Sequence, residues 1–244
     1  MKGEGIKRRL RAWLDIDANE DARNAWLRHT LGSLPAGLRV LDAGAGELRN
    51  KPLCQHMRYV SQDVCQYEGL GDSKGLHMGT WDTSRIDLVC DITNIPEPDA
   101  SFDVILCSEV FEHLTDPLKA LDEFRRLMKP GGKLILTAPF SSLVHFAPQH
   151  FATGFSRYWY EHHLPLRGLQ ISELTANGDW FSFARQELLR LPSMARRYGH
   201  WAWPLAYGLV ALGLVFFALP GFRRSAHDVA CFGWHCVALK VARA

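Results

Sequence analysis

The sequence predicts an α/β fold, in which a mostly parallel sheet carries helices on both faces. Short runs of apolar residues alternate with longer segments in which apolar residues recur at helical spacing. The short runs are almost continuously apolar, which is typical of strands buried on both faces of a parallel sheet. With 244 residues, 47% of them hydrophobic and 22% charged, the chain can bury the core of one such domain.

The first predicted element is an N-terminal helical region, residues 1–37. Leu10, Trp13 and Trp26 fall on helical patterns, and the sequence Ser-Leu-Pro-Ala-Gly at residues 33–37 breaks them. Residues 38–244 are then predicted to form a single domain around the sheet.

Seven apolar runs in that domain predict seven strands, at residues 38–42, 58–61, 86–90, 102–107, 133–138, 168–174 and 230–241. Between the fourth and fifth runs, Leu118, Leu121, Phe124 and Leu127 recur at spacings of three and four. This spacing predicts a helix over residues 117–128 that faces the sheet, and a Pro-Gly-Gly sequence at residues 130–132 ends it.

The first strand ends in the sequence Val-Leu-Asp-Ala-Gly-Ala-Gly, at residues 40–46. Gly44 and Gly46 lack a Cβ, so a ligand can approach the backbone closely at this turn. A helix predicted to begin at about Glu47 would add free N–H groups there. The alternative explanation is tight packing of a strand against a helix, without any ligand.

The residues after the turn argue against a dinucleotide. The dinucleotide fingerprint requires a third glycine three residues after the second, where this chain has Arg49. Glu47 would also repel a pyrophosphate. A cofactor that carries an ammonium and a sulfonium group, and no phosphate, fits this turn better.

Two carboxylates follow the next two strands in order. Asp63 lies 21 residues beyond Asp42, at the end of the second strand, where it can accept both ribose hydroxyls of an adenosine. Asp91 follows the third strand and is placed to take the adenine amino group. Either residue alone could be a helix cap, but the three signals in this order together predict an adenosine site.

The chain resembles the class I S-adenosylmethionine (SAM)-dependent methyltransferases, through four blocks in the family's order over roughly residues 38–140. The blocks are residues 40–46, residues 62–64 (Gln-Asp-Val), residues 90–105, and residues 109–114 (Glu-Val-Phe-Glu-His-Leu) running into 127–132. The resemblance implies a Rossmann-like fold and SAM as the methyl donor.

The same resemblance implies which residues touch the cofactor. Gly44 and Gly46 would border its methionine end, Asp63 would hold the ribose, and Asp91 with the Ile92 backbone would hold the adenine. Together the expected contacts are Asp42, Gly44, Ala45, Gly46, Asp63, Val64, Asp91, Ile92, Ser108, Glu109 and His113.

Ser108 and Glu109, at the end of the fourth strand, would line the methionine moiety. Glu112 and His113 resemble the Glu-His pair that recurs after that strand in the family. For His113, packing within a helix is as good an explanation as contact with the cofactor.

The substrate side is expected after the fifth strand, in residues 141–168, where histidines and aromatic residues are concentrated. An oxygen or carbon acceptor needs a base to remove its proton. His145 and His150 are the first candidates and Tyr158 is the next, although histidines in such loops also serve as caps and filler. The segment contains no HxxxH or HxH spacing, so the sequence predicts no metal site.

Residues 201–219, from Trp201 to Leu219, contain no charged residue and lie in an expected helical insertion, residues 190–226. The length suits a membrane span. A single crossing, however, would separate the last strand from its sheet, and arginine pairs flank the segment on both sides, at 196–197 and 223–224. We therefore expect association with the membrane surface, as a helix in the interface or as a bent, re-entrant hairpin that Pro204, Gly208 and Gly213 would permit. Burial in the protein's own core or in a homodimer contact is the alternative.

These features favour an acceptor that is a small molecule, a glycan or a lipid-linked compound, such as a lipid-linked sugar intermediate or a quinone precursor. A weaker resemblance to methyltransferases of surface-polysaccharide biosynthesis favours a sugar hydroxyl. A second hypothesis is a catalytically silent SAM-binding partner or scaffold, against which the histidine-rich segment argues.

The charge and the cysteines restrict the partners and the compartment. A formal net charge of +2 does not favour nucleic-acid binding. The six cysteines form no CxxC pair, and no secretory signal is recognisable. We expect a cytoplasmic protein, peripheral at the inner face of the membrane if the apolar segment binds lipid.

Overall fold

The computed structural model describes residues 18–66, 75–76, 81–218 and 226–241. Leu10, Trp13, Leu219 and the arginine pair at 223–224, on which parts of the sequence predictions rest, lie outside the described residues. The chain divides into two compact units, one of Asn24–Thr175 with Gly233–Ala244, and one of Met1–Arg23 with Ala176–Phe232.

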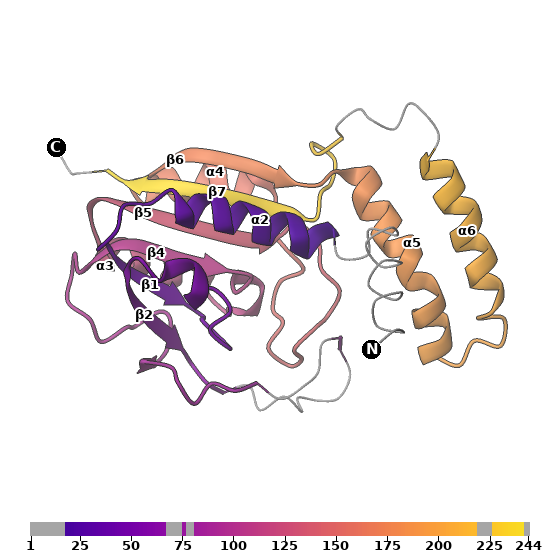
Figure 1. Cartoon of the computed structure of the whole chain (residues 1–244), viewed down its shortest axis with the longest axis horizontal. Helices are drawn as coiled ribbons and strands as arrows, with labels where there is room; N and C mark the ends of the chain where they lie inside the picture. The colour runs from indigo at the N-terminus through magenta and orange to yellow at the C-terminus, as the bar shows by residue number, and fades with distance from the viewer. Residues whose placement is uncertain (1–17, 67–74, 77–80, 219–225, 242–244) are drawn as a thin grey trace. The chain divides into compact units, whose positions relative to one another are not determined.

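Within the described residues, the sheet has seven strands in the order β3-β2-β1-β4-β5-β7-β6 (Figure 1). The strands are β1 (Arg39–Ala43), β2 (Arg58–Asp63), β3 (Leu88–Val89), β4 (Phe102–Ser108), β5 (Met128–Pro139), β6 (Leu169–Asn177) and β7 (Gly233–Lys240). The pairs from β3 to β5 are parallel, and β7 runs antiparallel to β5. The predicted α/β fold with a mostly parallel sheet is confirmed.

The segment between β1 and β2 differs from the prediction. Instead of an α-helix from Glu47, the chain makes turns and then the short 3₁₀ helix η1 (Lys51–Cys54). Leu48 has a positive φ of 61°, which a right-handed helix excludes, and Pro52 cannot donate a backbone hydrogen bond. The expected helix N-terminus beside the glycine turn was therefore wrong.

Helix α2 (Ala18–Gly32) lies within the N-terminal region, residues 1–37, in which the sequence predicts helix. Leu27 and Leu31 are fully buried in one cluster with Val40, Val104 and Ile135 from three neighbouring strands. Figure 1 shows α2 in front of the sheet and α4 (Arg157–Leu166) behind it. The sheet is thus covered on both faces, which accounts for its continuously apolar strands.

Helix α3 (Pro117–Leu127) confirms the helix predicted between the fourth and fifth strands. The carboxylate of Asp116 caps it by accepting from the Lys119 amide at 3.0 Å, and proline is tolerated in its first turn. Leu121, Phe124 and Leu127 are fully buried, as their spacing predicted. The helix leads directly into β5, at Met128.

Helices α5 (Trp180–Arg197) and α6 (Leu205–Ala218) form a hairpin in the smaller unit (Figure 1). They pack closely at Gly213, where a Cβ would lie 2.2 Å from a methyl group of Leu188. Ala206 and Val210 of α6 are buried, whereas other large apolar side chains of this helix are exposed. No helix in the described part of the chain combines the length and the apolar character needed to cross a membrane.

Candidate active site

The glycine turn lies at the carboxyl end of β1, next to the end of β2. Gly44 and Gly46 have φ values of 75° and 51°, which favour glycine. The Gly44 amide donates to the Gln62 carbonyl at 2.9 Å, and the Gly46 amide donates to the Asp63 carboxylate at 2.9 Å. Residues at the end of β2 therefore hold the turn in place.

Asp63, predicted to hold a ribose, supports the backbone with both carboxylate oxygens. One accepts from Gly46 and the other accepts from the Cys65 amide at 2.9 Å. This leaves lone pairs on each oxygen for further donors. Val64, the next residue, is 42% exposed at the same edge of the sheet.

Asp91 lies just beyond β3 and is exposed. One of its carboxylate oxygens accepts from both the amide and the hydroxyl of Thr93, each at 2.7 Å. These hydrogen bonds lower the pKa of Asp91. They close a local turn and do not cap a helix, because no helix follows Asp91, while Ile92 beside it is buried.

Asp42 lies beneath the turn and is only 1% exposed. The hydroxyl of Tyr59 donates to its carboxylate at 2.6 Å. Burial raises the pKa of Asp42 from 3.8 to about 6, and the hydrogen bonds from Tyr59 and Asn50 partly offset this effect. Its side chain thus supports the turn from the core.

Two side chains that the sequence analysis did not identify lie against the glycines. A Cβ on Gly44 would be 2.5 Å from a methyl group of Val110, and one on Gly46 would be 2.3 Å from the ring of Trp81. The Trp81 ring also makes an edge contact with Phe146, with centroids 4.9 Å apart. Both glycines are therefore required sterically, and a lone tryptophan in a loop gave no signal of this contact.

At the end of β4, polar groups connect to β5 through Thr137, which is fully buried. The Thr137 hydroxyl donates to the Glu109 carboxylate at 3.0 Å and is 2.8 Å from the hydroxyl oxygen of Ser108. Glu109 adopts a positive φ of 55°. Ser108 and Glu109 thus lie at the sheet edge where the sequence placed them, and Thr137 orients both.

The segment after β5 brings two predicted histidines to the end of β4. The amides of Phe151 and Ala152 donate to the Glu112 carbonyl, at 2.8 and 3.1 Å, and so attach this segment to the 3₁₀ helix η2 (Phe111–His113). The ring centroids of His113 and His145 are 4.7 Å apart, and those of His145 and His150 are 4.9 Å apart. We call His113, His145 and His150 the histidine cluster.

Burial affects the charge of this cluster. It lowers the pKa of His113 to about 4, although a hydrogen bond with the Gln149 carbonyl opposes the effect. It also lowers the pKa of His150. At neutral pH both rings are therefore uncharged. Tyr158, the third predicted base, is 64% exposed on α4 and packs under the guanidinium of Arg157.

A family model described as a methyltransferase domain matches residues 16–210, most of the chain. The chain belongs to this methyltransferase family. Its seven-stranded sheet and its glycine turn are those of the class I, SAM-dependent methyltransferases, as the sequence resemblance implied.

Among curated relatives, the chain is 32% identical over 114 residues to a ubiquinone biosynthesis O-methyltransferase of Xylella fastidiosa, covering 46% of each chain. It is 31% identical over 109 residues to a demethylmenaquinone methyltransferase of Deinococcus radiodurans, covering 43% of this chain and 41% of the relative. The chain thus spans less than half the length of these curated relatives.

Solved structures share the fold at low sequence identity. The [4+2]-cyclase SpnF superimposes with a TM-score of 0.55 at 16% identity, over 91% of this chain and 81% of SpnF. A SAM-bound phosphoethanolamine N-methyltransferase 2 of Haemonchus contortus gives a TM-score of 0.51 at 18% identity, over 95% of this chain and 60% of its own. One of these proteins is named a cyclase, so the reaction has to be argued from the site and not from the fold.

Proposed function

We propose that this methyltransferase transfers a methyl group from SAM to a hydroxyl of a lipid-linked or other small acceptor, such as a quinone precursor or a lipid-linked sugar. The observation that carries the proposal is the histidine cluster, which lies beyond the ends of β4 and β5, on the same sheet edge as the glycine turn. A catalytically silent SAM-binding protein would not need this group.

The residues at this edge fit a cofactor of SAM's chemistry. Gly44 and Gly46 form a backbone cradle that a Cβ would fill. Three carboxylates lie at or just beyond the ends of β2, β3 and β4, those of Asp63, Asp91 and Glu109. Carboxylates suit the hydroxyl, amino and ammonium groups of SAM and would repel a pyrophosphate. When bound, SAM supplies an electrophilic methyl group on its sulfonium.

In this proposal each carboxylate has one role. Asp63 accepts from the ribose hydroxyls, Asp91 with the Ile92 backbone binds the adenine, and Glu109 with Ser108 binds the methionine end. Thr137 fixes the orientation of Glu109 through its hydrogen bond of 3.0 Å. The Trp81 ring, packed on Gly46, borders the same site.

His150 is the base that we propose. The hydroxyl of Ser142 donates to the Thr153 carbonyl at 3.0 Å, so at 3.4 Å it accepts from Nε2 of His150. Nδ1 is then the basic nitrogen of the neutral ring. As the acceptor oxygen bonds to the methyl carbon and the carbon–sulfur bond breaks, the hydroxyl proton passes to this Nδ1. S-adenosylhomocysteine and the methyl ether are the products.

We also propose that α6 binds an anionic membrane surface, which would bring a lipid-linked acceptor to the enzyme. Leu205, Leu209, Leu212 and Val215 of α6 are each 60–67% exposed. At the end of α5, Arg196 and Arg197 supply positive charge for anionic headgroups. Exposed apolar side chains beside cations are the features of an interfacial helix. A homodimer contact over α6 is the alternative.

A binding experiment tests the cofactor site. S-adenosylhomocysteine at 100 times its dissociation constant should raise the free energy of unfolding by about 2.7 kcal/mol, whereas NAD should have no effect. Asp63→Asn should weaken S-adenosylhomocysteine at least about 10-fold, because a charged acceptor is lost. Thermal unfolding with increasing ligand measures both effects.

The matched control is Asp122→Asn, on α3, whose carboxylate is 60% exposed and pairs with Arg167. This variant should bind S-adenosylhomocysteine as the wild type does. Stabilisation by NAD alone, or equal affinity in Asp63→Asn and the wild type, would contradict the proposed site.

A further inference from the structure

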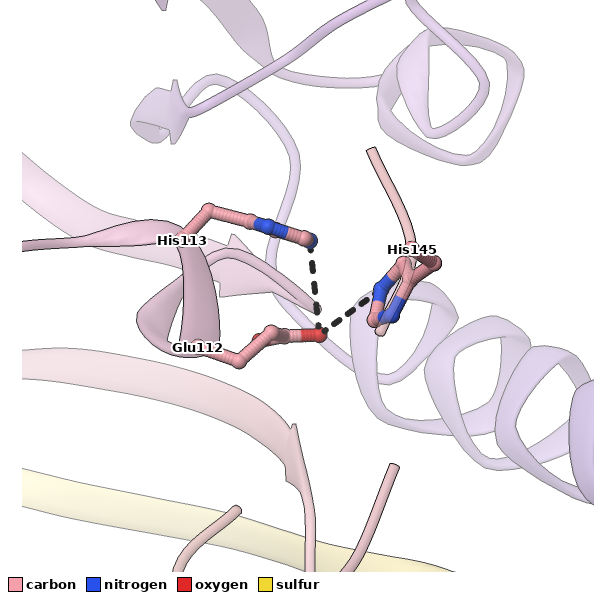
Figure 2. Close-up of side chains that lie close together, drawn as sticks. All are labelled: Glu112, His113 and His145. Carbon is pink, nitrogen blue, oxygen red and sulfur yellow. Dashed lines mark ion pairs between the residues drawn. The ribbon is translucent and has the colours of Figure 1, made fainter. Parts of the chain in front are cut away.

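Three side chains of types that bind metal ions lie close together, those of Glu112, His113 and His145. His145 is 32 positions beyond His113 in the sequence. Nε2 of His113 and Nε2 of His145 each lie 3.7 Å from the same carboxylate oxygen of Glu112 (Figure 2). One ligand atom from each residue lies within 4.8 Å of the other two. The HxxxH and HxH spacings considered in the sequence would not find this group.

Hydrogen bonds at the other ring nitrogens fix which nitrogen of each histidine faces the carboxylate. Nδ1 of His145 is 2.9 Å from the Leu143 carbonyl, and Nδ1 of His113 is hydrogen-bonded to the Gln149 carbonyl. A carbonyl only accepts, so both Nδ1 atoms donate. In the neutral rings, both Nε2 atoms then present lone pairs toward Glu112.

Three electron-rich atoms thus face one another in a shielded site. The Glu112 side chain is 1% exposed, and those of His113 and His145 are 17% and 15% exposed. Such a group of donor atoms can share one cation, whose positive charge each of them attracts. A histidine that donates from its second nitrogen to a carbonyl is also the usual arrangement of a metal-bound histidine.

We propose that Glu112, His113 and His145 bind one divalent transition-metal cation, with Zn²⁺ the preferred ion. Two imidazole nitrogens and one carboxylate suit Zn²⁺ and its neighbours in the first transition series, whereas Mg²⁺ and Ca²⁺ prefer oxygen ligands alone. Ligands of a tetrahedral Zn²⁺ lie about 3.4 Å apart, from bond lengths of about 2.0–2.1 Å. Each histidine nitrogen starts 3.7 Å from the Glu112 oxygen, and no two of the three ligand atoms are more than 4.8 Å apart, so side-chain movements of about 1 Å bring them to this spacing.

Three protein ligands leave one coordination position open. In a role that rests on the proposed function, the hydroxyl oxygen of the acceptor would occupy this position, since the group lies next to His150. A bound cation lowers the pKa of a coordinated hydroxyl and so eases the loss of its proton to His150. Metal binding itself does not depend on this role.

The test is a titration of the purified, chelator-treated full chain with Co²⁺, monitored by the visible absorption of four-coordinate cobalt. We expect saturation at one equivalent, displacement by Zn²⁺ and no displacement by excess Mg²⁺. Glu112→Gln and His145→Ala should each weaken cobalt binding by about 10–100-fold or more. Loss of a residue that only hydrogen-bonds to a metal ligand already has an effect of this size, and these two residues are proposed as ligands themselves. His162→Ala, an exposed histidine on α4, should bind cobalt as the wild type does.

Circular dichroism and stabilisation by S-adenosylhomocysteine check the fold of each variant. If Glu112→Gln does not fold, His145→Ala decides, because its side chain comes from a loop. Absence of stoichiometric cobalt binding, or unchanged affinity in His145→Ala, overturns the metal site and leaves the proposed function standing. Tight metal binding without methyl transfer to any acceptor would instead refute the proposed function.

Discussion

Asp42, beneath the glycine turn, is a buried carboxylate with a raised pKa. It is fully buried, close to Tyr59 and Asp63, and burial raises its pKa from 3.8 to about 6. The folded protein therefore binds one more proton than the unfolded chain between about pH 4 and pH 6. Stability from this group is complete below pH 4 and is lost as the pH rises through about 6.

Asp42→Asn should remove this dependence, because asparagine stays neutral and can still accept from Tyr59. Relative to the wild type, the variant should gain up to about 3 kcal/mol in the free energy of unfolding between pH 4 and pH 8. Urea unfolding at a series of pH values measures the difference. If the gain in the free energy of unfolding of Asp42→Asn over the wild type does not change with pH, or decreases as the pH rises, the raised pKa of Asp42 is contradicted.

The sequence predicted the positions of several site residues but not their contacts. It placed Asp63 and Glu109 at strand ends, because apolar runs mark where parallel strands end and a sheet has one carboxyl edge. It did not identify Trp81, Val110 or Thr137, whose roles depend on contacts between distant segments. The pairing of Glu112 with His145 was missed for the same reason.

Among the helices and strands, α6 shows most clearly what an uncharged, apolar run in the sequence can predict. Residues 201–219 lack charge, and the structure confirms that a helix, Leu205–Ala218, lies within them. The sequence could not decide which side chains are covered. The structure shows that one face meets α5 through Gly213, while Leu209 and Leu212 remain exposed.

Leu212→Glu should weaken binding to vesicles made of equal parts phosphatidylcholine and phosphatidylglycerol. Burying a leucine contributes about 1.5–3 kcal/mol, so the partition coefficient should fall about 10-fold or more. Vesicle flotation measures it. Leu166→Glu, at a leucine on α4 that is 71% exposed against 66% for Leu212, is the matched control and should float as the wild type does.

Two outcomes would contradict the proposed binding of α6 to a membrane surface. The wild type could remain unbound in flotation, or it could form a homodimer in light scattering that Leu212→Glu dissociates. The second result would assign the exposed face of α6 to a contact between two copies of this chain.

The segment between β1 and β2 is where the predicted secondary structure was wrong. Apolar periodicity identified the strands on both sides, but the expected helix from Glu47 is a series of turns and η1. The positive φ of Leu48 belongs to the packed turn and has no signature in the sequence. Element types in long periodic segments were thus predictable, and local backbone geometry at the site was not.

At the scale of the whole molecule, the strand order brings the ends of β1, β2 and β4 together as neighbours. Segments far apart in the sequence thereby meet at one edge: the glycine turn, Asp63, Glu109 and the histidine cluster. The proposed cofactor half of this edge could be predicted because its residues lie at or just beyond strand ends. The proposed acceptor half depends on the path of residues 140–152, which no periodicity encodes.

The most direct test of the central claim follows a labelled methyl group from SAM into a membrane-containing extract. We predict label in an organic-soluble product that resists mild base, as a methyl ether does and a methyl ester does not. His150→Ala should slow the reaction by about 10²–10⁴-fold, while His162→Ala should not. Label released by base, or no label in the lipid, glycan and small-molecule fractions, would contradict methyl transfer to a hydroxyl.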